Sequence, residues 1–230
     1  STSGDTNDEK TVTYQVQAPA GGWSSSFNDT YTLMVVADQL GDPDGNTSLG
    51  QELGQFTVDI SLAGPMSVNS TEDLPDIDLA DNISHAGDGM ATLRSAIMQA
   101  NHTSGLDTVT VPAGTYTLTR SGAGEDLAVT GDLDVTDSLT LEGDGTSTTI
   151  INANGLDRVF DLHSGQHVVT LTLRNMTIQG GDVTGDGGGI LANGNLVLEN
   201  VVVTGNSASG DGGGIRASRQ LQVTGSSISG

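Results

Sequence analysis

The chain has 230 residues, enough for one or two domains. Its formal net charge of −22 arises from 29 acidic residues against 7 Lys and Arg, which argues against nucleic-acid phosphates and anionic membranes as partners. Cysteine is absent, so disulfides and thiolate metal sites are excluded, and no apolar run has the length of a membrane-spanning segment.

Residues 1–62 are expected to form a first β module. Residues 11–18, 31–37 and 55–61 have the composition of strands, and turn-rich stretches separate them. Three strands make about half of a sandwich, which is too few to bury two faces.

A second feature of this module is an alternating set of oxygen-bearing side chains, Asp42, Asp44 and Asn46. Such alternation opens a calcium-binding loop, but the match to an EF-hand stops after Asn46. The segment is therefore either a calcium site or an Asp/Pro/Gly turn between strands, and turn chemistry favours the turn.

Residues 63–88 are polar and acidic, and they lack apolar periodicity. We expect a linker that leads into a capping segment, with one short strand near residues 77–80. Residues 92–101 then form the one convincing helix, because Leu93, Ile97 and Ala100 fall at helical spacing and Thr92 can act as N-cap. The apolar face of this helix is expected to cover the open end of the β structure that follows, where core side chains and strand edges would otherwise be exposed.

The remainder of the chain predicts short strands that become regular toward the C-terminus. Residues 107–119 contain two strands around a Pro-Ala-Gly turn, and residues 131–142, 148–152 and 158–162 continue the pattern. Residues 171–195 (LTLRNMTIQGGDVTGDGGGILANGN) and 196–220 (LVLENVVVTGNSASGDGGGIRASRQ) are then two copies of one repeat, and a third begins at Leu221.

This repeat predicts a stacked solenoid of strands, in which each unit buries its apolar face against its neighbours. Apolar and outward positions alternate in residues 171–173 and 196–198, which is the strand period. Asn175 and Asn200 interrupt the alternation and suit a sharp left-handed turn between two short strands. About 25 residues then make one coil of a parallel β-helix, with equivalent residues stacked about 4.8 Å apart.

Residues 90–119 (MATLRSAIMQANHTSGLDTVTVPAGTYTLT) resemble the N-terminal signature of CSLREA-type domains. In that family a Leu-Arg-x-Ala-Ile helix followed by Ala-Asn leads into a right-handed parallel β-helix, and the resemblance spans residues 85–230. Ala91 stands where the motif has Cys, and Ser95 stands where it has Glu. The missing Glu would complete a capping box, so its loss is expected to weaken the start of the helix slightly.

Two further resemblances bear on localisation. The Gly-Gly-Gly-Ile repeats resemble those of bacterial polymorphic outer-membrane proteins and adhesin stalks, and residues 11–62 resemble the C-terminal part of a bacterial Ig-like module. Together the resemblances imply an all-β chain: a partial Ig-like β-sandwich (1–62), a linker or capping segment (63–88), and a capped right-handed parallel β-helix truncated at its C-terminal end (89–230). They imply a bacterial or archaeal protein that is secreted or attached to the cell surface, and they transfer no catalytic residues.

Catalytic residues are therefore sought among charged side chains near the first coils. The carboxylate candidates are Glu125, Asp126, Asp132, Asp134, Asp157 and Asp161, and the basic candidates are Arg158 and Arg174. A polysaccharide lyase needs clustered carboxylates for calcium and a basic proton acceptor, and a glycoside hydrolase needs two carboxylates that flank the sugar bond. The structural alternative is that Asp132 and Asp134 are outward strand residues and that Arg158 pairs with Asp157 or Asp161.

Cation binding along the repeat is a second hypothesis. Asp186 and Asp211 occupy the same repeat position, where calcium could bridge neighbouring coils, although an Asp that simply tolerates the turn before Gly is favoured. The four histidines, His85, His102, His163 and His167, are scattered and do not favour a metal site.

These observations favour a non-enzymatic segment of a large secreted or cell-surface protein. Its expected role is structural or adhesive, with polysaccharide or another cell-surface protein as partner and calcium as the one cofactor considered. The alternative is a polysaccharide lyase or glycoside hydrolase of the parallel β-helix type.

Overall fold

The computed structural model describes residues 29–35, 37, 49–58, 66–122, 124–165 and 167–229. The chain divides into two compact units, Ser1–Ile60 and Ser61–Gly230. In the first unit, strands β1 (Asp29–Val35) and β2 (Gln51–Val58) pair antiparallel. The expected strand at residues 11–18 and the expected calcium loop at Asp42, Asp44 and Asn46 lie outside the described residues.

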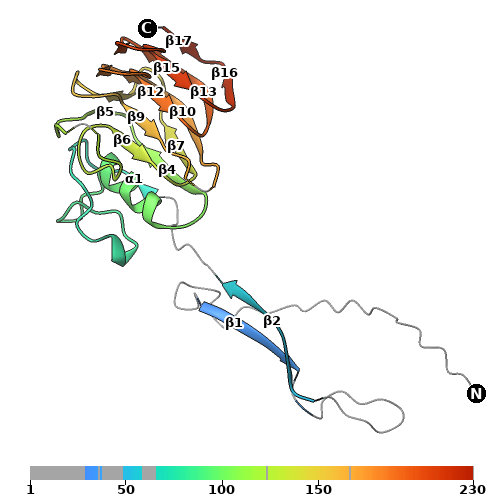
Figure 1. Cartoon of the computed structure of the whole chain (residues 1–230). Helices are drawn as coiled ribbons and strands as arrows, with labels where there is room; N and C mark the ends of the chain where they lie inside the picture. Colours follow the sequence, from blue (N-terminus) through green and yellow to red (C-terminus); the bar gives the residue numbers. More distant parts are fainter. Residues whose placement is uncertain are drawn as a thin grey trace, which may run out of the picture. The chain divides into compact units, whose positions relative to one another are not determined.

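The second unit consists mostly of short strands, as the sequence predicts (Figure 1). Before the first long strand lie β3 (Met66–Ser67), a 3-10 helix (Leu79–Asp81) and α1 (Leu93–His102). The strands that follow are β4 (Asp107–Val111), β5 (Gly114–Thr117), β6 (Leu133–Val135), β7 (Leu139–Gly143), β8 (Thr149–Asn152), β9 (Phe160–Leu162), β10 (Thr170–Gln179), β11 (Asp182–Val183), β12 (Ile190–Ala192), β13 (Asn195–Thr204), β14 (Ser207–Ala208), β15 (Ile215–Ala217), β16 (Leu221–Thr224) and β17 (Ser227–Ile228). Neither of the described helices is long and apolar enough to span a membrane.

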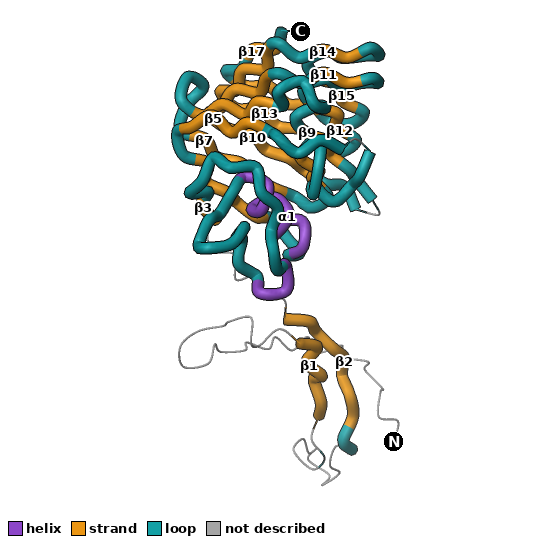
Figure 2. Tube along the Cα trace, turned by 90° about the vertical axis from the view of Figure 1, so that its left-hand side faces the viewer, coloured by secondary structure: helices purple, strands orange, loops and turns teal. Residues whose placement is uncertain are grey.

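These strands form three sheets in which all pairs are parallel. The main sheet runs in the order β3, β4, β7, β10, β13 and β16, with β5, β8 and β17 attached to it. A second sheet contains β6, β9, β12 and β15, and a short third sheet pairs β11 with β14. The chain therefore visits the sheets in turn and adds one strand on each pass, and the passes stack from α1 at one end to β17 and the C-terminus at the other (Figures 1 and 2).

The stacking places each repeat residue beside its counterpart. Leu171 of β10 pairs with Leu196 of β13, and Leu196 pairs in turn with Leu221 of β16. Hydrogen bonds between neighbouring passes join residues 25 positions apart, for example Asn200 to Asn175, which confirms the predicted repeat length. Between β7 and β10 the offset is 32 positions, so the earlier passes are longer and less regular than the later ones, as the sequence predicts.

Asn175 and Asn200 bend the two longest strands. Both have left-handed backbone, with φ of 53° and 55°, and the Asn200 side chain donates a 2.8 Å hydrogen bond to that of Asn175. The first half of β10 pairs with β7, and its second half pairs with β8. The bend at Asn175 therefore lets one strand pair with two different strands of the preceding pass. The left-handed backbone expected at these asparagines is confirmed, although the residues on both sides form one continuous strand rather than two short ones.

Inside the stack, the side chains between the sheets are apolar and fully enclosed. Leu141, Leu173 and Leu198 lie in register across β7, β10 and β13 and are 0% exposed. Phe160 and Ile190 form the equivalent row of the second sheet. Each such row buries apolar area on every pass, which is the main source of stability in a fold of this kind.

Close packing of the backbone explains why each repeat contains three consecutive glycines, at residues 187–189 and 212–214. The backbone N–H groups of residues 187–190 donate to the carbonyls of residues 211–214 in the next pass, so the two runs lie directly against each other. A Cβ at Gly188 would collide with the backbone oxygens of Ser207 and Gly213. Only a residue without a side chain fits there.

This steric limit predicts that Gly188→Ala destabilises the protein, at a cost of about 1–3 kcal/mol from overpacking against backbone that cannot move aside. Gly165→Ala is the matched control, because a Cβ there meets nothing within 4 Å. Urea unfolding of both variants measures the difference. Equal stability of the two variants would contradict the close packing of the Gly runs.

At the N-terminal end, α1 covers the stack as predicted. Leu93, Ala96, Ile97 and Ala100 are at most 2% exposed, and Thr92 is the N-cap. The expectation that Ser95 weakens the helix start is wrong. The Ser95 hydroxyl accepts a 2.9 Å hydrogen bond from the Thr92 N–H and thus completes the capping box in place of Glu.

Residues 66–88 are part of the second unit. β3 pairs with β4 and extends the main sheet, and the short strand expected near residues 77–80 is instead a 3-10 helix, capped by the Asp78 side chain. An Asp and Asn at the two ends of this turn favour a local hydrogen-bonded turn over strand pairing, which explains the difference.

Candidate functional site

Carboxylates gather where β6 and β9 lie side by side in the second sheet. Asp134 of β6 is the register partner of Asp161 of β9. Asp132 and Asp134 alternate with the core residues Leu133 and Val135, as expected of outward strand residues, yet they are only 3% and 1% exposed. The reason is the loop before β6, which folds back so that the Ala128 N–H donates a 2.8 Å hydrogen bond to Asp134 Oδ2.

Arg158 connects two of these carboxylates. Its Nη1 lies 3.0 Å from Asp132 Oδ2 and 2.7 Å from Asp161 Oδ2. The predicted structural pairing with Asp161 is therefore present, whereas Asp157 accepts a hydrogen bond from the backbone N–H of Arg158. A guanidinium held by two acids is a weak candidate for a proton acceptor.

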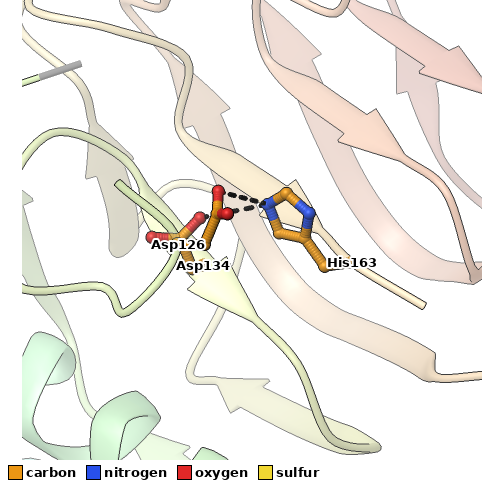
Figure 3. Close-up of side chains that lie close together, drawn as sticks. All are labelled: Asp126, Asp134 and His163. Atoms are coloured by element: carbon orange, nitrogen blue, oxygen red, sulfur yellow. Dashed lines mark ion pairs between the residues drawn. The ribbon is translucent and has the colours of Figure 1, made fainter. Parts of the chain in front are cut away.

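A histidine completes the cluster (Figure 3). His163 Nε2 lies 3.3 Å from Asp134 Oδ1 and 3.5 Å from Asp126 Oδ1. The same nitrogen lies 3.3 Å from Asp161 Oδ1. Among the residues that the structure describes, Asp126, Asp134 and His163 are the one group of His and carboxylate side chains arranged closely enough to hold a metal ion.

The sequence interpretation did not assign His163 to a site, because the four histidines are scattered along the chain. A usable signal was present: residues 133–135 and 160–162 share the pattern apolar-Asp-apolar. Aligning these strands places Asp134 beside Asp161 and His163 one residue beyond β9.

The loop that precedes β6 carries the two remaining acidic candidates. Glu125 accepts hydrogen bonds from the backbone N–H groups of Leu127 and Thr130, at 2.9 and 2.6 Å, and so holds the loop in shape. Asp126 has a 74% exposed side chain and also borders a cavity of about 240 Å³. The other residues lining this cavity are Leu79, Met98, Asn101, His102, Leu127, Val129 and Thr136.

Burial and mutual repulsion shift the acidity of the cluster. Burial, with the Asp157 charge next in importance, raises the pKa of Asp132 to about 7. Burial together with the Asp132 charge raises the pKa of Asp134 to about 8. Burial also raises the pKa of Asp161, against the opposing effects of His163 and Arg158. With pKa values of about 7 and 8, Asp132 and Asp134 can retain a proton near neutral pH.

The cluster is anchored to α1 through Arg94, which is 1% exposed. Arg94 Nε lies 2.5 Å from Asp73 Oδ1, and its Nη atoms donate to the carbonyls of Ala128, Gly131 and Asp132. Asp73 Oδ2 in turn accepts from the N–H groups of residues 119 and 120. One buried ion pair thus ties residues 66–88, α1 and the loop over Asp134 together.

Replacing Asp73 by Asn is expected to destabilise the second unit by about 3–5 kcal/mol, because a buried guanidinium loses its counter-charge. Thermal unfolding followed by circular dichroism measures the effect. Glu72→Gln removes the same charge from the exposed neighbouring residue and should leave the melting temperature nearly unchanged. A small effect of Asp73→Asn would show that the ion pair does not hold the cap.

The remaining predicted residues lie outside this cluster, on β10 and in the turns before β12 and β15. Arg174 of β10 pairs with Glu142 of β7 and Glu199 of β13, at 3.5 and 2.6 Å. Asp186 accepts a 2.8 Å hydrogen bond from the Asp211 N–H, and its other oxygen lies 3.3 Å from Arg216 Nε. Calcium between Asp186 and Asp211 remains a prediction, and it would compete with Arg216.

Comparisons of the chain with protein-family models, curated proteins and solved structures find no match. The resemblances to CSLREA-type and Ig-like domains therefore remain predictions from the sequence.

Proposed function

We propose that the second unit is a right-handed parallel β-helix of the CSLREA type that serves as a structural or adhesive rod in a secreted or cell-surface protein. The parallel sheets, the 25-residue register and the capping helix support this proposal. The first unit is then the C-terminal part of an Ig-like spacer module, for which the antiparallel pair β1 and β2 is the supporting observation.

The observation that carries a binding role is a polar groove across the main sheet. This groove has a volume of about 510 Å³ and is lined by Glu142, Arg174, Asn175, Glu199, Asn200, Thr224 and Gly225. Its polar groups lie in register from strand to strand, so carboxylate, guanidinium and amide groups form a row of donors and acceptors. Such a row suits the hydroxyl groups of an extended carbohydrate chain.

The charge of the groove and of the whole chain indicates which class of polysaccharide would bind. The groove contains two carboxylates and one guanidinium, and the whole chain carries a net charge of −22. A polyanion would be repelled at the distances involved, so a neutral polysaccharide is the preferred ligand.

The alternative function is a polysaccharide lyase or hydrolase that uses Glu125, Asp126, Asp132, Asp134 and Arg158. The raised pKa values of Asp132 and Asp134 favour it, since a general acid needs a pKa near the working pH. Against it stand the burial of both carboxyls and the two ion pairs of Arg158.

The binding role is tested by pull-down of a panel of neutral and acidic insoluble polysaccharides, with assays for new reducing ends and unsaturated uronate on the same samples. We expect retention on a neutral polymer without cleavage. Arg174→Gln should weaken retention about tenfold, because a charged group lost from a binding groove costs on the order of 1.5 kcal/mol or more.

Arg216→Gln is the matched control for this experiment. Arg216 is 39% exposed in its side chain against 40% for Arg174, and each arginine pairs with an acidic residue, but Arg216 lies in the second sheet. Equal loss in both variants, or no retention on any polymer, would refute the groove as a binding site. Cleavage would instead support the enzyme and direct mutation to the Asp132–Asp134 cluster.

A further inference from the structure

The geometry around His163 points to a metal site that is separate from the polar groove. Asp134 and Asp161 have side chains that are only 1% and 8% exposed, and each uses one carboxylate oxygen for a protein contact. Asp134 Oδ2 accepts from the Ala128 N–H, and Asp161 Oδ2 contacts Arg158. The second oxygen of each, Oδ1, is directed toward His163 Nε2.

These three buried atoms have no hydrogen-bond partner. Asp134 Oδ1, Asp161 Oδ1 and His163 Nε2 are each shielded from solvent, and although the nitrogen lies 3.3 Å from both oxygens, the groups are not oriented for a hydrogen bond. A buried polar atom without a partner destabilises the folded state, and here three occur together. A cation bound to Asp134 Oδ1 and His163 Nε2 would satisfy two of them directly and lie near the third.

The separations of the donor atoms indicate which cation fits. A tetrahedral ion with bonds of about 2.0–2.1 Å to nitrogen and oxygen places its ligand atoms about 3.3–3.4 Å apart. The His163 nitrogen lies 3.3 Å from the Asp134 oxygen and 3.5 Å from the Asp126 oxygen. We propose that Asp126, Asp134 and His163 bind a divalent transition-metal ion of the Zn²⁺ type, with Asp161 Oδ1 as a neighbouring carboxylate oxygen.

The donor set also argues against calcium at this position. Calcium takes six to eight oxygen ligands and is bound through carboxylates, carbonyls and water, whereas imidazole nitrogen is a preferred ligand of zinc and its neighbours. Three protein ligands leave the fourth tetrahedral position for water, as in open zinc sites. Asp126 is largely exposed and supplies the route of entry from solvent.

A protonated His163 that forms ion pairs with the same aspartates is the competing explanation, and metal titration separates the two. The untagged full chain is treated with chelator, dialysed and titrated with Zn²⁺ by calorimetry, with Ca²⁺ in a parallel titration. Co²⁺ serves as the spectroscopic probe, because tetrahedral Co²⁺ with nitrogen and oxygen ligands absorbs strongly in the visible. We expect a single Zn²⁺ site, a higher melting temperature in the presence of Zn²⁺, and the tetrahedral Co²⁺ spectrum.

Asp126→Asn and His163→Gln should each weaken Zn²⁺ binding at least about tenfold, since loss of even an outer partner of a metal site costs 10–100-fold in affinity. Asp126 is exposed, so Asp126→Asn should fold normally. It therefore still tests the site if His163→Gln fails to fold. The controls are Asp144→Asn and His167→Gln, which replace exposed residues of the same types outside the cluster.

Absence of Zn²⁺ binding would overturn the proposal, and so would equal affinity of the site variants and the controls. Tighter binding of Ca²⁺ than of Zn²⁺, lost in Asp126→Asn, would overturn the assignment of the ion. None of these results depends on whether the groove binds polysaccharide, so the two proposals are tested separately.

Discussion

The structure of the second unit depends on one constraint, the parallel register that sets each pass of the chain on the one before. Backbone hydrogen bonds between passes fix this register, and the apolar rows at Leu173 and Leu198 fill the space that they enclose. A parallel register places equivalent residues of successive repeats side by side. A residue type that packs well at one repeat position therefore packs against its own kind in the next pass. The same constraint demands Gly188 where two backbones meet, and it makes the side-chain rows of each face continuous.

Register also builds both candidate sites. On the main sheet it alternates Glu142, Arg174 and Glu199, so opposite charges lie next to each other and form a stable polar row. On the second sheet it sets Asp134 beside Asp161, two like charges whose repulsion adds to the effect of burial. In the first arrangement each charge has a partner of opposite sign. In the second, a bound cation would reduce the repulsion between the two carboxylates. We therefore assign a metal ion to the second sheet and a polymer to the main sheet.

Much of the architecture could be predicted from sequence because the repeat is explicit. The 25-residue stride, the bend at Asn175 and the helix after Thr92 all depend on local chemistry that the residues themselves display. The cluster of acidic side chains around His163 could be predicted only in part. Its carboxylates were candidates, but the burial of Asp134, the approach of His163 and the Asp73–Arg94 pair arise from contacts between segments distant in sequence, which no local pattern reports.

The most direct test of the account is the register itself, measured with paired cysteines. The chain has no cysteine, so Thr172→Cys with Val197→Cys introduces a unique thiol pair at positions that lie opposite each other in β10 and β13. A short thiol-specific cross-linker should join this pair rapidly within one molecule. Thr172→Cys with Thr204→Cys, placed at the far end of β13, should react slowly. Equal rates for the two pairs would contradict the parallel, in-register stack of the second unit.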